Sequence, residues 1–115
     1  MKQVSPIASV LLVSVSAIYH LYFFVIPSVT IVNRSGDVIE LARVSLPSSG
    51  LDFGRLDPAS ENTIHYAPEQ SDGVYQIRIG FAGGAGISGV CGSVTRNEIH
   101  KRQLIAIYSS SIVCE

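Results

Sequence analysis

The residues from 7 to 26 form an apolar run without a formal charge, and this run constrains the fold more than any other feature. At about 1.5 Å of rise per residue, a helix over this run is about 30 Å long, which is the thickness of the hydrocarbon core of a bilayer. Pro27 follows and ends such a helix, because proline lacks the backbone donor that the next turn needs. The run therefore predicts a transmembrane anchor helix over 1–27.

The flanks of the run suggest an orientation and leave one alternative open. Lys2 precedes the run, so the positive-inside rule places the N-terminus in the cytoplasm and the rest of the chain in the periplasm or outside the cell, as in a single-pass protein of the inner membrane. Tyr19 and Tyr22 fit the aromatic belt at the outer interface. The alternative is a signal peptide cleaved after Ala17, which is a small residue. Against cleavage, the chain stays apolar beyond Ala17 and the mature protein would expose that segment.

One stripe of the expected helix is more polar than the rest. At about 100° per residue, four side chains fall within an arc of about 60°; they are Ser5, Ser9, Ser16 and His20. Small and polar residues on one stripe allow helices to approach closely and to form hydrogen bonds in lipid. The stripe is therefore a candidate contact face for a partner helix or a second copy. The alternative is that the serines are merely tolerated and His20 lies at headgroup level.

The residues from 28 to 115 show short β patterns separated by turn residues. The clearest is 74–81, where Tyr75, Ile77, Ile79 and Phe81 share one face. A break in phase within 38–46 predicts a bulge near residues 42 and 43. The remaining expected strands cover 29–32, 63–66, 87–95, 104–108 and 112–114, with a short apolar piece at 51–56. The predicted fold is mainly β: the anchor helix precedes a small antiparallel β-sandwich, immunoglobulin-like, of seven to eight strands. An open barrel is the alternative.

Two cysteines lie in strands that we expect to be neighbours. A disulfide between Cys91 and Cys114 closes a loop of about 24 residues, which the chain-entropy model values at roughly 3–4 kcal/mol. Such a bond fits an oxidising compartment outside the cytoplasm. A metal site that joins both cysteines to His65 and His100 lacks any closely spaced ligand pair, and a thiol enzyme would have to leave Cys91 unpaired. We therefore predict no cofactor, no metal and no enzyme.

Two motifs that suggest chemistry have simpler interpretations. The stretch 84–89 matches GxGxxG, but a dinucleotide site needs a helix to begin there, and the following residues are β-rich. We interpret it as a hairpin tip in which Gly84 and Gly86 are candidate contacts. Asn33 begins a glycosylation sequon, but it also lies in a predicted turn, where asparagine is common.

A basic loop is the other candidate contact surface. It contains Arg96, His100, Lys101 and Arg102, and it is interpreted either as a contact for a small anion or lipid headgroup or as an ordinary solvated loop. The net charge of the chain is −1 at pH 7, which gives no electrostatic footprint for nucleic acid.

The segments 29–36 and 91–95 and the closing Cys114-Glu115 resemble small bacterial single-pass membrane proteins of unknown function with one immunoglobulin-like β domain. The resemblance implies a fold and a location in the cell envelope, and it assigns no active residue. The chain departs from antibody-type domains because it has no tryptophan.

These observations favour an extracytoplasmic interaction module that is anchored in a membrane and acts as an accessory part of an envelope complex. Its expected partners are the lipid bilayer and a membrane-proximal protein or a second copy. The alternative is a sensor domain for a small ligand or ion. An exposed apolar patch favours the first hypothesis, and an enclosed pocket lined by Arg78 or His65 favours the second.

Overall fold

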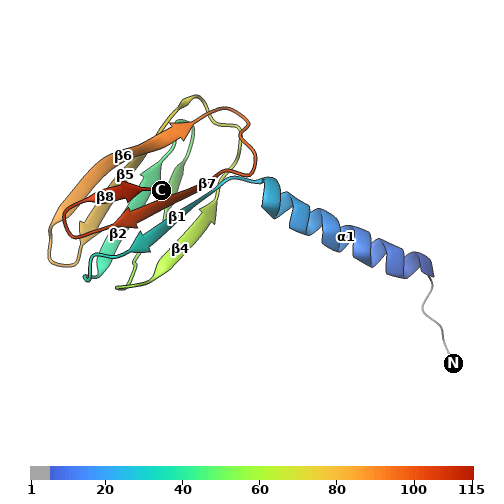
Figure 1. Ribbon diagram of the computed structural model, residues 1–115, viewed down its shortest axis with the longest axis horizontal. Coiled ribbons are helices and arrows are strands. Elements are labelled where there is room, and N and C mark those ends of the chain that lie inside the picture. Colours follow the sequence, from blue (N-terminus) through green and yellow to red (C-terminus); the bar gives the residue numbers. More distant parts are fainter. Residues whose placement is uncertain (1–5) are drawn as a thin grey trace.

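The computed structural model describes residues 6–115, and within its helix it describes the side chains of residues 12–22 and 25. One helix precedes eight strands along the chain (Figure 1). The elements are α1 (Pro6–Val25), β1 (Ser28–Asn33), β2 (Ile39–Ser45), β3 (Gly50–Asp52), β4 (Glu61–His65), β5 (Gly73–Phe81), β6 (Gly86–Val94), β7 (Arg102–Ile107) and β8 (Ile112–Cys114). These bounds follow the predicted strands closely, because alternating apolar residues and turn chemistry specify strands locally.

The strands form two separate four-stranded sheets, with the order β4-β1-β7-β8 in one and β3-β2-β5-β6 in the other. The sandwich-like arrangement is therefore confirmed, and the open barrel is excluded. One ladder differs from the all-antiparallel expectation, because β1 and β7 are parallel. The first two strands also lie in different sheets, whereas strands A and B of an immunoglobulin domain are neighbours in one sheet.

The core lies between the sheets and is formed by the inward residues of both. On β5, Tyr75, Ile77, Ile79 and Phe81 are all buried, as their alternation predicts. The register of β2 shifts between Ile39 and Leu41, two or three residues before the predicted bulge. Most of the core consists of aliphatic side chains, so hydrophobic burial is the main stabilising term.

The prediction of a transmembrane helix over 1–27 is wrong. Among the described residues, no helix combines the length and the apolar character that crossing a membrane requires. Polar side chains at Ser14, Ser16 and His20 interrupt the apolar surface of α1. The helix ends at Val25, two residues before Pro27, and it projects from one end of the sandwich (Figure 1).

Candidate functional site

The loop between β6 and β7 packs against the carboxyl end of α1. The backbone N–H of His100 donates to the Val25 carbonyl at 2.6 Å, and Arg102 Nη1 donates to the Ile26 carbonyl at 2.5 Å. The Ser28 N–H donates to the Lys101 carbonyl at 2.9 Å. These bonds place three residues of the predicted basic loop at the junction of helix and sandwich.

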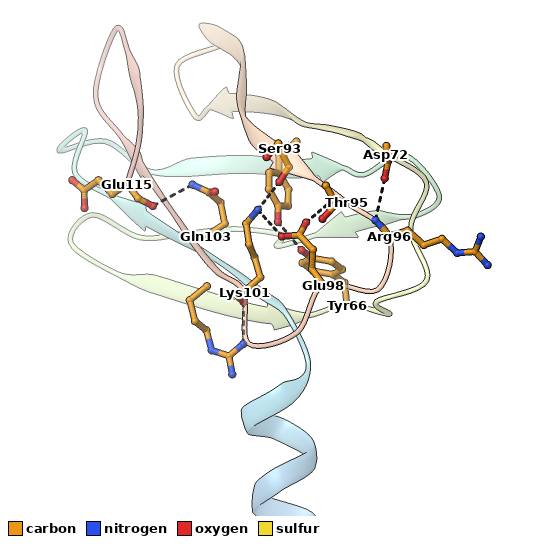
Figure 2. A network of polar contacts seen from close by, with 11 residues as sticks. Tyr66, Asp72, Ser93, Thr95, Arg96, Glu98, Lys101, Gln103 and Glu115 are labelled. Carbon is orange, nitrogen blue, oxygen red and sulfur yellow. Dashed lines mark hydrogen bonds and ion pairs between the residues drawn. The ribbon is translucent and has the colours of Figure 1, made fainter.

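Within this junction, Lys101 is committed to internal contacts. Its Nζ lies 3.0 Å from Glu98 Oε2, donates to the Ser93 carbonyl at 2.5 Å and lies 5.6 Å from the centre of the Tyr75 ring. Glu98 Oε1 also accepts a bond from the Thr95 N–H at 2.5 Å. Figure 2 shows the Lys101 amine between Ser93 and Glu98. Lys101 therefore fixes the loop rather than offering a charge to a ligand.

The carboxyl of Glu98 is ionised more readily than usual. Partial burial works against ionisation, but the Thr95 N–H and the Lys101 amine outweigh it and lower the pKa of Glu98. Arg96, at the start of the loop, is held by its backbone N–H, which donates to Asp72 Oδ1 at 3.1 Å. Its guanidinium points away from the network in Figure 2. The side chains of Arg96 and Lys101 thus do not converge on one point.

A buried pair of tyrosines lies behind this network. The hydroxyls of Tyr66 and Tyr75 are 2.6 Å apart, and the two rings meet edge to face at 6.2 Å. Burial is the main cause that raises the pKa of each hydroxyl, so both stay protonated at neutral pH. The hydrophobic alternation predicted that Tyr75 is buried, but nothing in the sequence indicated its partner. The pair is suited to packing and not to proton transfer.

An open groove of about 840 Å³ separates the last turns of α1 from the segment that follows β4. Its lining is mainly apolar and includes Ile18, Leu21, Tyr22, Val25, His65 and Tyr66. His65 thus lies beside a groove, as the sensor hypothesis required, but the groove is open and not enclosed.

The glycine-rich tip lies at the end of the sandwich opposite to α1 (Figure 1). Gly84 has a φ of +90°, which a turn between β5 and β6 requires and which glycine adopts without strain. Gly86 begins strand β6 and not a helix, so the predicted hairpin is confirmed. The tip and the basic loop therefore belong to opposite ends of the molecule and cannot form one contact surface.

The predicted cysteine pair is present. Cys91 on β6 and Cys114 on β8 are joined by a disulfide, with their Cα atoms 5.7 Å apart. β6 and β8 are edge strands of different sheets, so the bond closes one side of the sandwich. Cys91 is buried and inaccessible as a nucleophile. The disulfide is therefore a structural feature.

Asn33 has a structural role that its glycosylation sequon did not indicate. Its side chain is fully buried, and Nδ2 donates to the carbonyls of Asp37 at 2.7 Å, Leu56 at 3.1 Å and Asp57 at 3.2 Å. Its Oδ1 accepts from both the N–H and the hydroxyl of Ser35. Asn33 therefore ties the turn after β1 to the segment before β4, and it cannot carry a sugar in the folded chain.

The polar stripe on α1 is only partly described. Ser5 lies outside the described residues, and so does the side chain of Ser9. Ser16 and His20 are exposed, and His20 meets the Tyr19 ring edge to face at 5.8 Å. At about 100° per residue, both lie on the side of the helix away from Ile18 and Leu21, which line the groove. The contact face stays a prediction.

Comparisons of the chain with protein-family models, with curated proteins and with solved structures give no match. Across residues 6–115, no group of His, Cys, Asp and Glu side chains is arranged to hold a metal ion.

Proposed function

We propose that this protein is an interaction module that attaches to a lipid surface through α1 and holds its sandwich beside that surface. The proposal concerns attachment to lipid and not passage across it. In this arrangement the sandwich is an accessory component of an assembly in the cell envelope, which it contacts through its loops and sheet edges.

The observation that carries the proposal is the exposed apolar surface of α1. Seven large side chains between Leu12 and Tyr22 are 59–72% exposed, namely Leu12, Val13, Val15, Ile18, Tyr19, Leu21 and Tyr22. At about 100° per residue, they leave no sector of the helix wider than about 100° without an apolar side chain. Soluble proteins rarely expose so much contiguous apolar surface unless another surface covers it.

The distribution of these side chains favours lipid over a protein groove. An amphipathic helix that docks in a protein groove has one apolar face, and its other face is polar. Here the apolar side chains point in all directions, so a groove would leave many of them in water. A lipid surface has no fixed shape, so it can take up apolar side chains from a wider part of the helix than a protein groove can.

Groups at the carboxyl end of α1 also support attachment to lipid. Arg102, the first residue of β7, lies beside the end of the helix, and its guanidinium donates directly to the Ile26 carbonyl. Cations near the lipid interface gain from anionic headgroups, and Tyr19 and Tyr22 are residue types that favour this interface. The disulfide supports an oxidising location, on the extracytoplasmic side of a membrane.

Flotation of the full chain with phosphatidylcholine vesicles tests the proposal. We expect the protein to rise with the vesicles and the V13N/I18N variant to remain at the bottom of the gradient. V90N is the matched control, because Val90 is 62% exposed on the sandwich and Val13 and Ile18 are 70% and 67% exposed on the helix. The control should float like the unmodified chain.

Two results would count against the proposal. The first is that the unmodified chain does not float. The second is that it forms a discrete oligomer without lipid and that the V13N/I18N substitutions abolish this oligomer. The second result would assign the helix to a protein partner or a second copy instead.

A further inference from the structure

The outer face of the β3-β2-β5-β6 sheet carries two arginines directly opposite each other. Arg43 on β2 pairs with Arg78 on β5, and the same row continues to Asp52 on β3 and Ser88 on β6. Like charges at directly opposed positions of a sheet destabilise it. The row therefore places a repulsive pair at the centre of an otherwise weakly charged face.

The two arginines have different surroundings. Arg43 is neutralised in part by Asp52, whose Oδ2 lies 3.6 Å from Arg43 Nη2. Arg78 is exposed, and within residues 6–115 it forms no ion pair. Its guanidinium is a planar donor that matches the oxygens of carboxylates and phosphates. The positive charge of Arg78 is thus available on this face.

The surface around Arg78 is hollowed. An open depression of about 560 Å³ is lined by Arg78 together with hydroxyl and amide side chains, namely Ser45, Gln76 and Ser88. Gly86 also lines it, on the same face as Ser88, and its lack of a side chain keeps this part of the depression open. A second depression of about 290 Å³ contains Arg43 and Asp52 and shares Ser45 with the first. The combined size suits a small molecule.

We propose that this depression binds a small molecule through an oxyanion, a phosphate or a carboxylate, which the Arg78 guanidinium holds. Ser45, Gln76 and Ser88 supply neutral hydrogen-bond donors around the anion, and Arg43 adds a second positive charge from the neighbouring strand. A bound anion converts the repulsion between the arginines into attraction for a shared ligand. The site involves no residue of α1 or of the loop beside it, so the proposal of an anion site can be tested independently of the proposal of lipid attachment.

Titration of the isotope-labelled full chain by NMR, in an uncharged maltoside detergent, tests this site with defined probes. Sodium phosphate and sodium acetate are added in separate arms, and sodium chloride at equal ionic strength is the reference. We expect saturable shifts of the Arg78 and Ser88 amides at millimolar phosphate or acetate but not with chloride. The stronger arm identifies which oxyanion the site prefers.

Two variants make the result specific. R78Q should weaken binding by about tenfold or more, because it removes the charge-assisted bonds to the anion. R55Q is the control with the same loss of charge, since Arg55 pairs with Asp57 and does not line the depression. It should change the affinity less than about twofold. The inference is overturned if chloride gives the same shifts, if the shifts spread evenly over the surface, or if R78Q binds like the unmodified chain.

Discussion

The hydroxyl pair of Tyr66 and Tyr75 leads to a quantitative prediction about the stability of the sandwich. The two oxygens are 2.6 Å apart, and the side chains are 5% and 0% exposed. A phenylalanine at either position keeps the ring, its edge-to-face partner and the contact of Lys101 with the Tyr75 ring. The substitution therefore removes one hydroxyl and leaves the other buried without its partner.

The expected energies follow from this geometry. A buried polar group that loses its only partner costs about 1–3 kcal/mol, so Y66F and Y75F should each lower the free energy of unfolding by about 2 kcal/mol. Replacing both partners by apolar groups of the same shape is nearly neutral, so the double variant should lose only about 1 kcal/mol. The loss in the double variant should therefore fall below the sum of the two single losses by about 2–3 kcal/mol.

Urea unfolding of the full chain, followed by far-ultraviolet circular dichroism, measures the stability of the unmodified chain, the two single variants and the double variant. At about 1 kcal/mol per molar urea, each single variant should shift the midpoint by about 2 M. Y108F is the matched control, because Tyr108 is only half-buried and its hydroxyl meets Arg34 at 3.4 Å. It should change stability by less than about 0.5 kcal/mol. Additive losses at Tyr66 and Tyr75 would refute the reasoning, since they would mean that the hydroxyls do not interact.

Three further predictions concern other parts of the sandwich. C114S should lower the free energy of unfolding by about 3 kcal/mol, and reductant should bring the unmodified chain to the same midpoint while leaving the variant unchanged. The pKa of Glu98 is lowered in the folded state, so the contribution of its carboxylate to the free energy of unfolding is complete above its ordinary pKa near 4.3 and is lost as the pH falls through the lowered value. E98Q should remove this pH dependence from acid unfolding curves, and an unchanged curve would contradict the prediction. G73A should lower the free energy of unfolding by about 1–3 kcal/mol, because the new Cβ would lie 2.6 Å from the Pro47 ring. In the control G83A the new Cβ meets no atom within 4 Å, so the loss should be less than about 1 kcal/mol. Equal urea midpoints for the two variants would argue against the close packing at Pro47.

The strands were predictable because their signals are local. The alternation from Tyr75 to Phe81 specifies both a strand and its buried face, and this face is the one observed. The cysteine pair was also predictable, because only two cysteines exist and both lie in β patterns. The parallel ladder of β1 and β7 could not be predicted, since it joins residues about 75 positions apart and depends on the register of the whole sheet.

The errors also have physical reasons. The length of the run 7–26 and its lack of formal charge predicted a helix that crosses a membrane, but this criterion gives no weight to the polar groups of Ser14, Ser16 and His20. Asn33 was interpreted as an ordinary turn residue. Its side chain forms five hydrogen bonds, and two of them reach carbonyls more than twenty positions away, which a local sequence pattern cannot indicate. The row of Arg43 and Arg78 emerged only when the strands were placed in register. Polar sites built from distant strands are thus the part that sequence patterns miss.

The connection between α1 and β1 has a mechanical consequence. Only Ile26 and Pro27 separate the helix from β1, and β1 is an inner strand with ladders to β4 on one side and β7 on the other. Tension along the helix therefore loads both ladders at once and in shear, so many backbone bonds must break together before the strand slides. An edge strand in the same place would load only one ladder. A pull on the helix is thus resisted by two ladders at the end where the helix leaves the sandwich.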